Sequence, residues 1–139
     1  MSRAALLPAG ADPFLNAYWL RHYRLWADEV DELFVQVCGQ DDPEIRAYIQ
    51  ACVDAVPHAS VVFTERIAHG TVIGQLLDRT SADLILLCED DAFIRRKDAV
   101  NQNFRRIEGG KTDIVGCPRN SASPELIDAA NRRFGQFQV

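Results

Sequence analysis

Short apolar runs alternate with longer segments of helical periodicity along this chain, and this alternation limits the folds that it can adopt. Five apolar runs can be distinguished, near residues 4–7, 33–38, 61–63, 84–88 and 114–117. Strands that alternate with helices are typical of βαβ units wound into a mainly parallel sheet. The sequence therefore predicts a Rossmann-like α/β domain with helices on both faces of the sheet.

Two helix starts are marked by an aspartate followed by a proline. Asp12 precedes Pro13, and Asp42 precedes Pro43, which are residue types preferred at the N-cap and at the first helical position. After Pro13, apolar residues recur at helical spacing and predict an aromatic-rich stripe that faces the sheet. The stripe consists of Phe14, Leu15, Tyr18, Trp19, His22, Leu25 and Trp26.

Further elements follow in the second half of the chain. A third helix is expected over residues 67–78, where Gly70 and Gly74 would allow close approach to the sheet or to a ligand. The run at residues 84–88 is apolar on both faces, which is typical of a central parallel strand covered by helices above and below. A fourth helix ends at Gly109, and a last helix is expected after the fifth strand, from residue 123 onward.

Length and charge exclude several classes of protein. With 139 residues the chain has the size of one domain, and we expect a single domain over residues 1–139. It has no run of about 18 apolar residues, so a transmembrane segment is not expected. The net charge of −5 argues against a surface that binds nucleic acid, because such surfaces need clustered Lys and Arg.

The cysteines and the amino-terminus indicate a cytoplasmic protein. Four cysteines, Cys38, Cys52, Cys88 and Cys117, lie without any C-x-x-C pair, as expected of small buried hydrophobic residues in a reducing compartment. The apolar run near residue 5 is too short for a signal peptide. The sequence therefore predicts a cytoplasmic location without disulfide bonds.

Three turns after predicted strands are candidates for ligand binding, because ligands of open α/β sheets bind beyond the carboxyl ends of the strands. The first turn can present backbone groups to a flat base, the second carries carboxylates that can accept hydrogen bonds from a base or ribose, and the third is a run of three acids. These turns contain Pro8, Ala9 and Gly10; Asp41 and Asp42; and Glu89, Asp90 and Asp91.

The acidic triplet is the sharpest of these signals. Three carboxylates at the end of a buried strand repel one another, so a cation should compensate them. Mg²⁺ or Mn²⁺ takes one or two carboxylates together with phosphate oxygens, and Glu89 and Asp91 at positions i and i+2 of an extended chain would point to the same side. The alternative is an acidic surface turn whose repulsion is relieved by the basic residues at positions 95–97.

These features resemble glycosyltransferases of the GT-A fold, family 2 in particular. The likeness rests on a helix, an apolar strand and an acidic triplet over residues 70–91, with strands at residues 5–8, 31–38 and 113–116 in matching places. The resemblance implies a metal-dependent glycosyltransferase that uses a UDP- or GDP-sugar. It assigns Asp91 and Glu89 to the Mn²⁺ or Mg²⁺ ion and Asp90 to the sugar. The nucleotide sugar would also contact Pro8, Ala9, Gly10, Asp41, Asp42 and Gly70.

The chain departs from this family in two ways. The second strand is followed by Cys38 and Gly39 instead of an aspartate, and no residue after Cys117 is suited to act as general base, because Glu125 and Asp128 fit the first turn of a helix. We therefore assign no catalytic residue. We expect an acceptor-binding part to be missing, so the 139-residue chain would bind the donor without transferring its sugar to an acceptor.

Two other functions stay open. A nucleotidyltransferase of related fold would need a Gly-rich phosphate loop with a Lys or Arg after the first strand, whereas residues 8–13 contain one glycine and no basic residue. A metal-binding module without enzymatic activity, such as a receiver domain, would need paired acids after the first strand and an aspartate after the third. Pro8 and Ala9, and Thr64 and Glu65, occupy those places.

Overall fold

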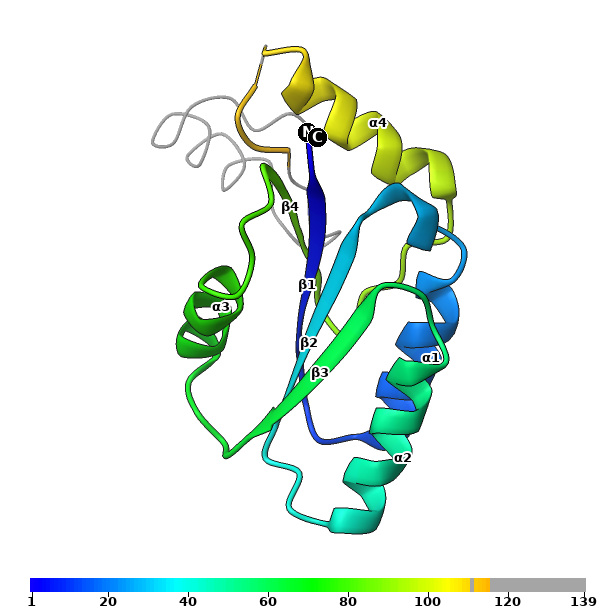
Figure 1. The fold of residues 1–139 in the computed structure, drawn as a ribbon, viewed down its shortest axis with the longest axis vertical. Coiled ribbons are helices and arrows are strands. Elements are labelled where there is room, and N and C mark those ends of the chain that lie inside the picture. Colours follow the sequence, from blue (N-terminus) through cyan, green and yellow to red (C-terminus); the bar gives the residue numbers. More distant parts are fainter. Residues whose placement is uncertain (111, 116–139) are drawn as a thin grey trace, which may run out of the picture. The chain divides into compact units, whose positions relative to one another are not determined.

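The computed structural model describes residues 1–110 and 112–115, and in this part of the chain four parallel strands form one sheet. The strands are β1 (Arg3–Ala9), β2 (Glu32–Cys38), β3 (Ala59–Thr64) and β4 (Leu84–Leu87), and their order across the sheet is β3-β2-β1-β4 (Figure 1). The direction of winding reverses between β3 and β4. The first three strands step outward from β1 on one side, and β4 then pairs with the other side of β1.

Helices cover both faces of this sheet (Figure 1). The helices are α1 (Pro13–Tyr23), the 3₁₀-helix η1 (Ala27–Glu29), α2 (Pro43–Asp54), α3 (His69–Leu77) and α4 (Lys97–Glu108). Helices α1 and α2 lie on one face of the sheet and α3 lies on the other. The predicted Rossmann-like α/β fold with helices on both faces is thereby confirmed. Among the described residues, no helix has the length and apolar character that crossing a bilayer requires.

The chain divides into two units, Met1–Asp98 and Ala99–Val139. The sheet, α1, α2 and α3 all belong to the first unit, and so does every residue of the site described below. The predicted fifth strand near residues 114–117 is described only in part, and Val115 carries a single bridge there. Cys117 and the expected last helix, with Glu125 and Asp128, lie outside the described residues.

The core of the first unit follows the alternation of side chains along the strands. Leu6 of β1 packs with Val72 and Leu76 of α3, and the partly buried Phe34 and Cys38 of β2 pack against this cluster. The residues between them point to the opposite face, where α1 and α2 lie. Those buried residues are Ala5, Leu7, Leu33, Val35 and Val37. Period-two burial on both faces is what a parallel sheet between helix layers requires.

Strand β1 runs further than its apolar residues predict. The sequence predicts a turn at Pro8 and Ala9. This prediction is wrong, because both residues lie inside the strand and pair with β2. The N–H and carbonyl groups of every second residue of β1 point toward β4. The Leu6 carbonyl, for example, accepts from the Cys88 N–H at 2.9 Å. The nitrogen of Pro8 faces the same side beyond the end of β4, so no ladder hydrogen bond is lost.

The buried stripe of α1 differs from the predicted aromatic stripe. The residues that α1 buries are Asn16, Trp19, Leu20 and Tyr23, at i, i+3, i+4 and i+7. Phe14 is 79% exposed, and Tyr18 and Leu25 are also exposed. Trp19 and Trp26 are buried as predicted. The rest of the stripe was wrong, because apolar residues occur on several sides of this helix and periodicity alone could not select the face that packs.

Strand β4 lies at an edge of the sheet formed by the described residues, and its expected central position stays a prediction because the fifth strand is described only in part. Within the described residues its neighbour is β1, and Ile85 and Leu87 are 38% and 46% exposed. The two residues lie on the α3 face, since Leu87 is in register with Leu6.

The two glycines of α3 do not bring this helix against the sheet. A Cβ atom added at Gly70 or Gly74 would meet no atom within 4 Å. The prediction that they allow close approach to the sheet is wrong. Helix α3 contacts β1 and β2 through Val72 and Leu76 instead.

Both predicted N-caps are confirmed, and the second one gives a test of helix stability. The Asp42 carboxylate accepts hydrogen bonds from the N–H groups of Glu44 and Ile45 at 2.8 and 3.3 Å. Asp42→Ala is therefore expected to lower the free energy of unfolding by about 1 kcal/mol, measured by urea denaturation. Asp41→Ala is the matched control, because the Asp41 side chain is 93% exposed. Equal losses in the two variants would contradict the capping role.

Candidate functional site

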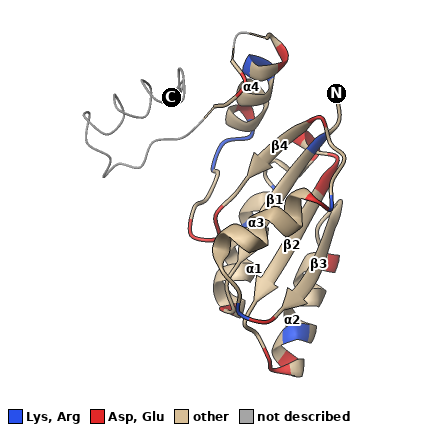
Figure 2. Cartoon of the chain, turned by 90° about the vertical axis from the view of Figure 1, so that its left-hand side faces the viewer, with Lys and Arg blue, Asp and Glu red and all other residues tan. Residues whose placement is uncertain are grey.

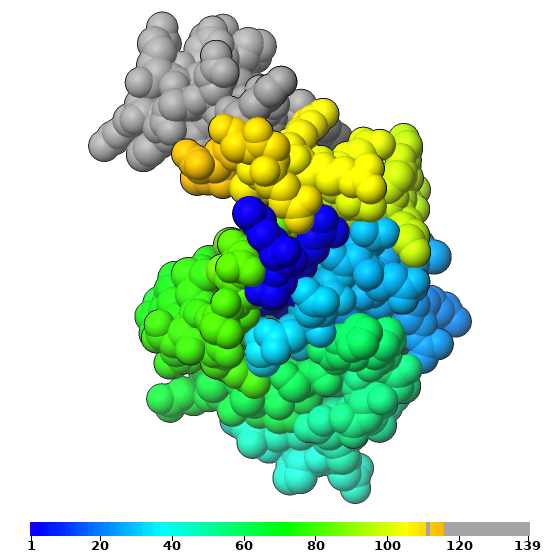
Figure 3. Space-filling view, turned by 45° about the horizontal axis from the view of Figure 1, so that its top comes forward, coloured from blue at the N-terminus to red at the C-terminus, as the bar shows by residue number. Residues whose placement is uncertain are grey.

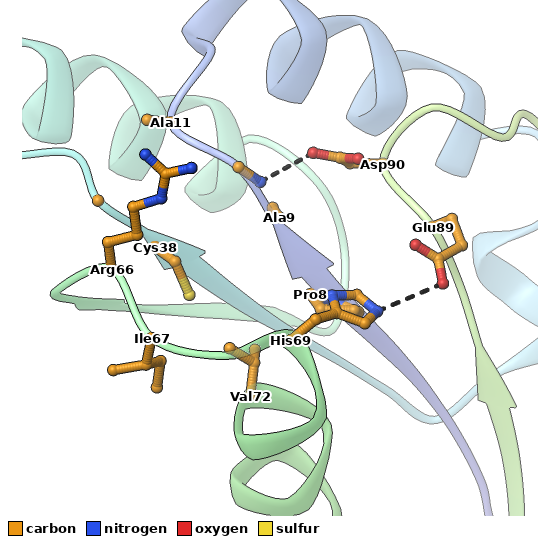
Figure 4. Close-up of a pocket in the computed structure, with 12 residues that line it drawn as sticks. Pro8, Ala9, Ala11, Cys38, Arg66, Ile67, His69, Val72, Glu89 and Asp90 are labelled. Carbon is orange, nitrogen blue, oxygen red and sulfur yellow. Dashed lines mark hydrogen bonds and ion pairs between the residues drawn. The ribbon is translucent and has the colours of Figure 1, made fainter.

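A pocket of about 420 Å³ opens at the carboxyl ends of the strands. Its volume lies in the range of small-molecule sites. The segments that follow β1, β2, β3 and β4 all contribute to it, so it lies where the winding of the sheet reverses, the usual ligand site of open α/β sheets. Its lining residues are Pro8, Ala9, Gly10, Ala11, Cys38, Gly39, Arg66, Ile67, His69, Val72, Glu89 and Asp90 (Figure 4).

Gly10 and Asp90 join the first and fourth strands across this pocket. The Gly10 N–H donates to Asp90 Oδ2 at 2.8 Å (Figure 4). Gly10 follows β1, and its N–H points to the β4 side like the backbone of Leu6, but β4 has ended by this level. The Asp90 carboxylate thus takes the position of a ladder acceptor and closes the sheet end where β1 and β4 diverge.

The segment after β1 is also held by two other side chains. Asn16 Nδ2 of α1 donates to the Gly10 carbonyl at 3.0 Å. Gln40 Nε2, from the loop after β2, donates to the Ala11 carbonyl at 2.8 Å. The backbone of Gly10 and Ala11 is therefore fixed from three elements, and the pocket wall that it forms has a defined geometry without a bound ligand.

Arg66 brings a positive charge to the pocket from the segment after β3. It is exposed, and its guanidinium extends toward the level of Ala11 (Figure 4). Its Cβ would lie 3.5 Å from a Cβ added at Gly39, whose φ of +79° favours glycine. In the described part of the chain no ion pair of Arg66 is found. Its charge is thus available to an anion in the pocket.

His69 and Glu89 form an ion pair at the side of the pocket. His69 Nε2 lies 3.5 Å from Glu89 Oε1, and both side chains are about half exposed (Figure 4). His69 is the first residue of α3, and Glu89 follows β4, so the pair links these two elements. Neither Arg66 nor His69 was among the sequence-predicted site residues. The rule that ligands bind beyond strand ends could have found them, since both follow β3.

The acidic triplet is arranged differently from the expectation. The Ala92 N–H donates to the Glu89 carbonyl at 3.2 Å, so residues 89–92 form a turn. An extended chain would place Glu89 and Asp91 on the same side, but a turn does not, and the pocket contains Glu89 and Asp90 while Asp91 is exposed outside it. Among the described residues, no group of three or more His, Cys, Asp or Glu side chains is arranged to hold a metal.

The turn after β4 is anchored on α1. Trp19 Nε1 donates to the Ala92 carbonyl at 3.1 Å, and the Phe93 ring packs at 5.0 Å from the rings of Tyr18 and His22. These contacts fix the position of Glu89 and Asp90 relative to the segment after β1. His22 thus packs with aromatic residues, as expected for a histidine on this helix.

The remaining predicted contact residues lie outside the pocket. Asp41 lies 3.8 Å from Arg46, and Asp42 caps α2. Gly70 lies one residue after His69 at the start of α3 but does not line the pocket. Of the predicted nucleotide contacts, the structure brings together Pro8, Ala9, Gly10 and Asp90, whereas Asp41, Asp42 and Gly70 are not among the lining residues.

The described cysteines are free thiols, as predicted. Cys38 lines the pocket, and its Sγ lies 3.3 Å from Thr64 Oγ1. Cys88, immediately after β4, is buried, and burial together with the neighbouring Glu89 carboxylate raises its pKa to about 12. Its thiol therefore stays protonated at neutral pH and acts as a small apolar residue under the acidic turn.

Figure 2 marks the charged residues along the backbone of the described chain. Lysines and arginines are separated from one another by acidic and uncharged segments there. Lys97 is paired with Asp28 and Glu29 at 3.3 and 3.9 Å. Figure 3 shows a view of the molecule in which residues near the amino-terminus lie between the third helix and the first.

Comparison with known proteins supports the α/β fold of this chain. Neither a family model nor a curated protein matches it. A solved structure of CMP:2-keto-3-deoxy-manno-octonic acid synthetase complexed with CTP is similar, with a TM-score of 0.55 and 14% sequence identity. The match covers 78% of this chain and 48% of the other, so the chain spans about half the length of that structure. At this identity the likeness concerns the fold alone.

Proposed function

We propose that the pocket binds a nucleotide and that the chain is the nucleotide-binding part of a nucleotidyltransferase. The observation that carries this proposal is a pocket at the reversal of the sheet that has small residues and backbone on one side and the uncompensated cation Arg66 on another. A flat base fits against small residues, and a phosphate needs a cation. The synthetase of similar fold was solved with CTP, which makes CTP the first nucleotide to test.

The position of Arg66 bears on the choice between nucleotidyl transfer and glycosyl transfer. The sequence lacks a basic residue in the segment after β1, which counted against nucleotidyl transfer. Arg66 supplies that charge from the segment after β3, and its side chain enters the same pocket. The absence of a basic residue in residues 8–13 therefore no longer argues against this function.

In nucleotidyl transfer, an oxygen of the acceptor attacks the α-phosphorus of a nucleoside triphosphate. A new P–O bond forms, the bond from the α-phosphorus to the bridging oxygen breaks, and pyrophosphate leaves with the electron pair. Arg66 offsets negative charge on the phosphates, and Gly10 and Ala11 provide the fixed wall against which the nucleotide lies. A divalent ion held by Glu89, Asp90 and phosphate oxygens would stabilise charge on the leaving pyrophosphate.

Glycosyl transfer from a UDP- or GDP-sugar is the second candidate. The observation that favours it is the acidic turn at residues 89–91 directly after β4, the feature on which the resemblance to GT-A glycosyltransferases rests. The donor pocket would be the same, with the diphosphate near Arg66. The acceptor and the residue that removes its proton are not assigned, so this proposal concerns donor binding by the described residues.

Calorimetric titration separates the two reactions by the ligand that each requires. A nucleotidyltransferase binds a nucleoside triphosphate, whereas a glycosyltransferase binds a nucleoside diphosphate sugar. We expect CTP, or another triphosphate from a panel with UTP and GTP, to bind more tightly than UDP- and GDP-sugars in buffer with Mg²⁺. Tighter binding of one diphosphate sugar than of every triphosphate would favour glycosyl transfer, and absence of binding by all of them would refute the proposed pocket.

The role of a divalent ion is tested by the same titration with Mg²⁺, with Mn²⁺ and with chelator. Because a divalent ion typically binds one or two carboxylates together with phosphate oxygens, chelator is expected to weaken nucleotide binding by about tenfold, or about 1.4 kcal/mol. Glu89→Gln should remove most of this dependence on metal. If binding is equally tight in chelator, the proposed metal site is wrong, while nucleotide binding itself would stand.

A further inference from the structure

Side chains hold both backbone polar groups of Gly10, its N–H and its carbonyl. Its N–H donates to Asp90 Oδ2 at 2.8 Å, and its carbonyl accepts from Asn16 Nδ2 at 3.0 Å. One partner comes from the turn after β4 and the other from α1. Gly10 is therefore the point where the acidic turn, the end of β1 and the first helix are connected, and it lies in the wall of the pocket.

The start of α1 explains why Asn16 reaches this carbonyl. Asp12 caps the helix through the N–H groups of Phe14 and Leu15, and Pro13 opens it. The helix thus begins three residues after Gly10, and Asn16 lies at its fourth position, where its N–H donates to the Asp12 carbonyl at 3.1 Å. The short connection places the Asn16 side chain within hydrogen-bond reach of the segment that leaves β1.

Asn16 is almost completely buried, with 2% of its surface exposed. Its Nδ2 faces the Gly10 carbonyl, and its Oδ1 is buried without a hydrogen-bond partner among the described residues. Burial of an unpaired amide oxygen costs free energy. An apolar side chain of similar shape would avoid that cost but would leave the Gly10 carbonyl without this donor, so the asparagine is tied to the backbone of Gly10.

We propose that Asn16 is a positioning residue of the nucleotide pocket. The Asn16 side chain holds the Gly10 carbonyl and thereby fixes the backbone of Gly10, so that the Gly10 N–H meets Asp90. The segment after β1 then keeps the shape against which the nucleotide lies. The expected effect of Asn16 on nucleotide affinity rests on the proposed nucleotide-binding function. The effect on the Gly10 peptide is a property of the free protein and can be measured without any ligand.

Asn16→Leu is the test variant, because leucine has a similar shape but cannot donate to the Gly10 carbonyl. The loss of this hydrogen bond and the removal of the unpaired Oδ1 have opposite effects on stability, so the free energy of unfolding should change little. Nucleotide affinity should fall by about tenfold in calorimetry. In ¹⁵N–¹H spectra of the free full-length chain, the Gly10 amide resonance should move more than the resonances of Gly70 and Gly74.

Ile49→Val is the matched control. Ile49 is buried in α2 and does not line the pocket, so this substitution should lower stability by roughly 1 kcal/mol without moving the Gly10 resonance or changing affinity. If the Gly10 resonance stays in place in Asn16→Leu, the positioning role is overturned. If the resonance moves and CTP does not bind even to the unmodified chain, the proposed function fails while the coupling of Asn16 to Gly10 stands.

Discussion

Replacement of Arg66 by alanine is expected to weaken nucleoside triphosphate binding by about 30-fold, or about 2 kcal/mol, the usual size of a hydrogen bond to a charged group. The guanidinium enters the pocket and has no ion pair in the described part of the chain. A phosphate is the group that its charge and planar donors fit. Because the side chain is exposed, the free energy of unfolding should change by less than about 0.5 kcal/mol.

Two variants control this experiment. Arg66→Lys keeps the charge but loses the paired donors, so its affinity should lie between those of the unmodified chain and Arg66→Ala. Arg21→Ala removes the same charge from an exposed position on α1 outside the pocket and should leave affinity unchanged. Calorimetry at one salt concentration measures all three. Equal losses for Arg66→Ala and Arg21→Ala would mean that only the net charge of the chain matters.

The second large effect concerns the helix that carries His69. Leu76 of α3 is fully buried in the cluster with Leu6 and Val72, whereas its neighbour Leu77 is 44% exposed. Leu76→Ala should lower the free energy of unfolding by about 3 kcal/mol, because it removes buried methyl groups and leaves a cavity. Leu77→Ala should lower it by less than about 1 kcal/mol.

Urea denaturation of the two leucine variants measures this difference directly. They share the same helix and the same substitution, so helix propensity cancels and burial against the sheet remains. A loss in Leu77→Ala as large as that in Leu76→Ala would contradict the orientation of α3. Since Val72 of this helix also lines the pocket, that result would also remove support for the described position of His69.

The elements that sequence predicted correctly are those whose signals are local. Asp12 with Pro13, and Asp42 with Pro43, mark helix starts because capping is decided within four residues of the chain. The apolar run that became β2 was predicted to within one residue, since β-branched and aromatic residues alternate there. These local signals were sufficient for the fold class, because strands alternating with helices have few ways to pack.

The features that sequence did not predict depend on contacts between distant segments. The extension of β1 through Pro8 and Ala9 follows from their pairing with β2, which the residues of β1 do not encode by themselves. The face of α1 that packs is set by the layer beneath it, and Trp19 and Tyr23 were buried in preference to the equally apolar Phe14. In both cases tertiary packing decided between alternatives that local patterns left equal.

The candidate site was predicted in part. Pro8, Ala9 and Gly10 line the pocket because they lie at the carboxyl end of the first strand, and Asp90 because it follows the fourth. Arg66 and His69 were missed because the segment after β3 carries no run of like charges that would distinguish it from a surface loop. The extended geometry assumed for Glu89 and Asp91 is replaced by a turn at residues 89–92, and Asp91 does not line the pocket.

The central claim is that a nucleotide binds in this pocket, and the most direct test is a ¹⁵N–¹H titration of the chain with CTP in the presence of Mg²⁺. Saturable shifts are expected for the amides of Gly10, Gly39 and His69, which line the pocket, with little change at Gly110 in the second unit. Saturable shifts that leave Gly10 and Gly39 in place, or no shifts with CTP, UTP, GTP or the diphosphate sugars, would contradict it.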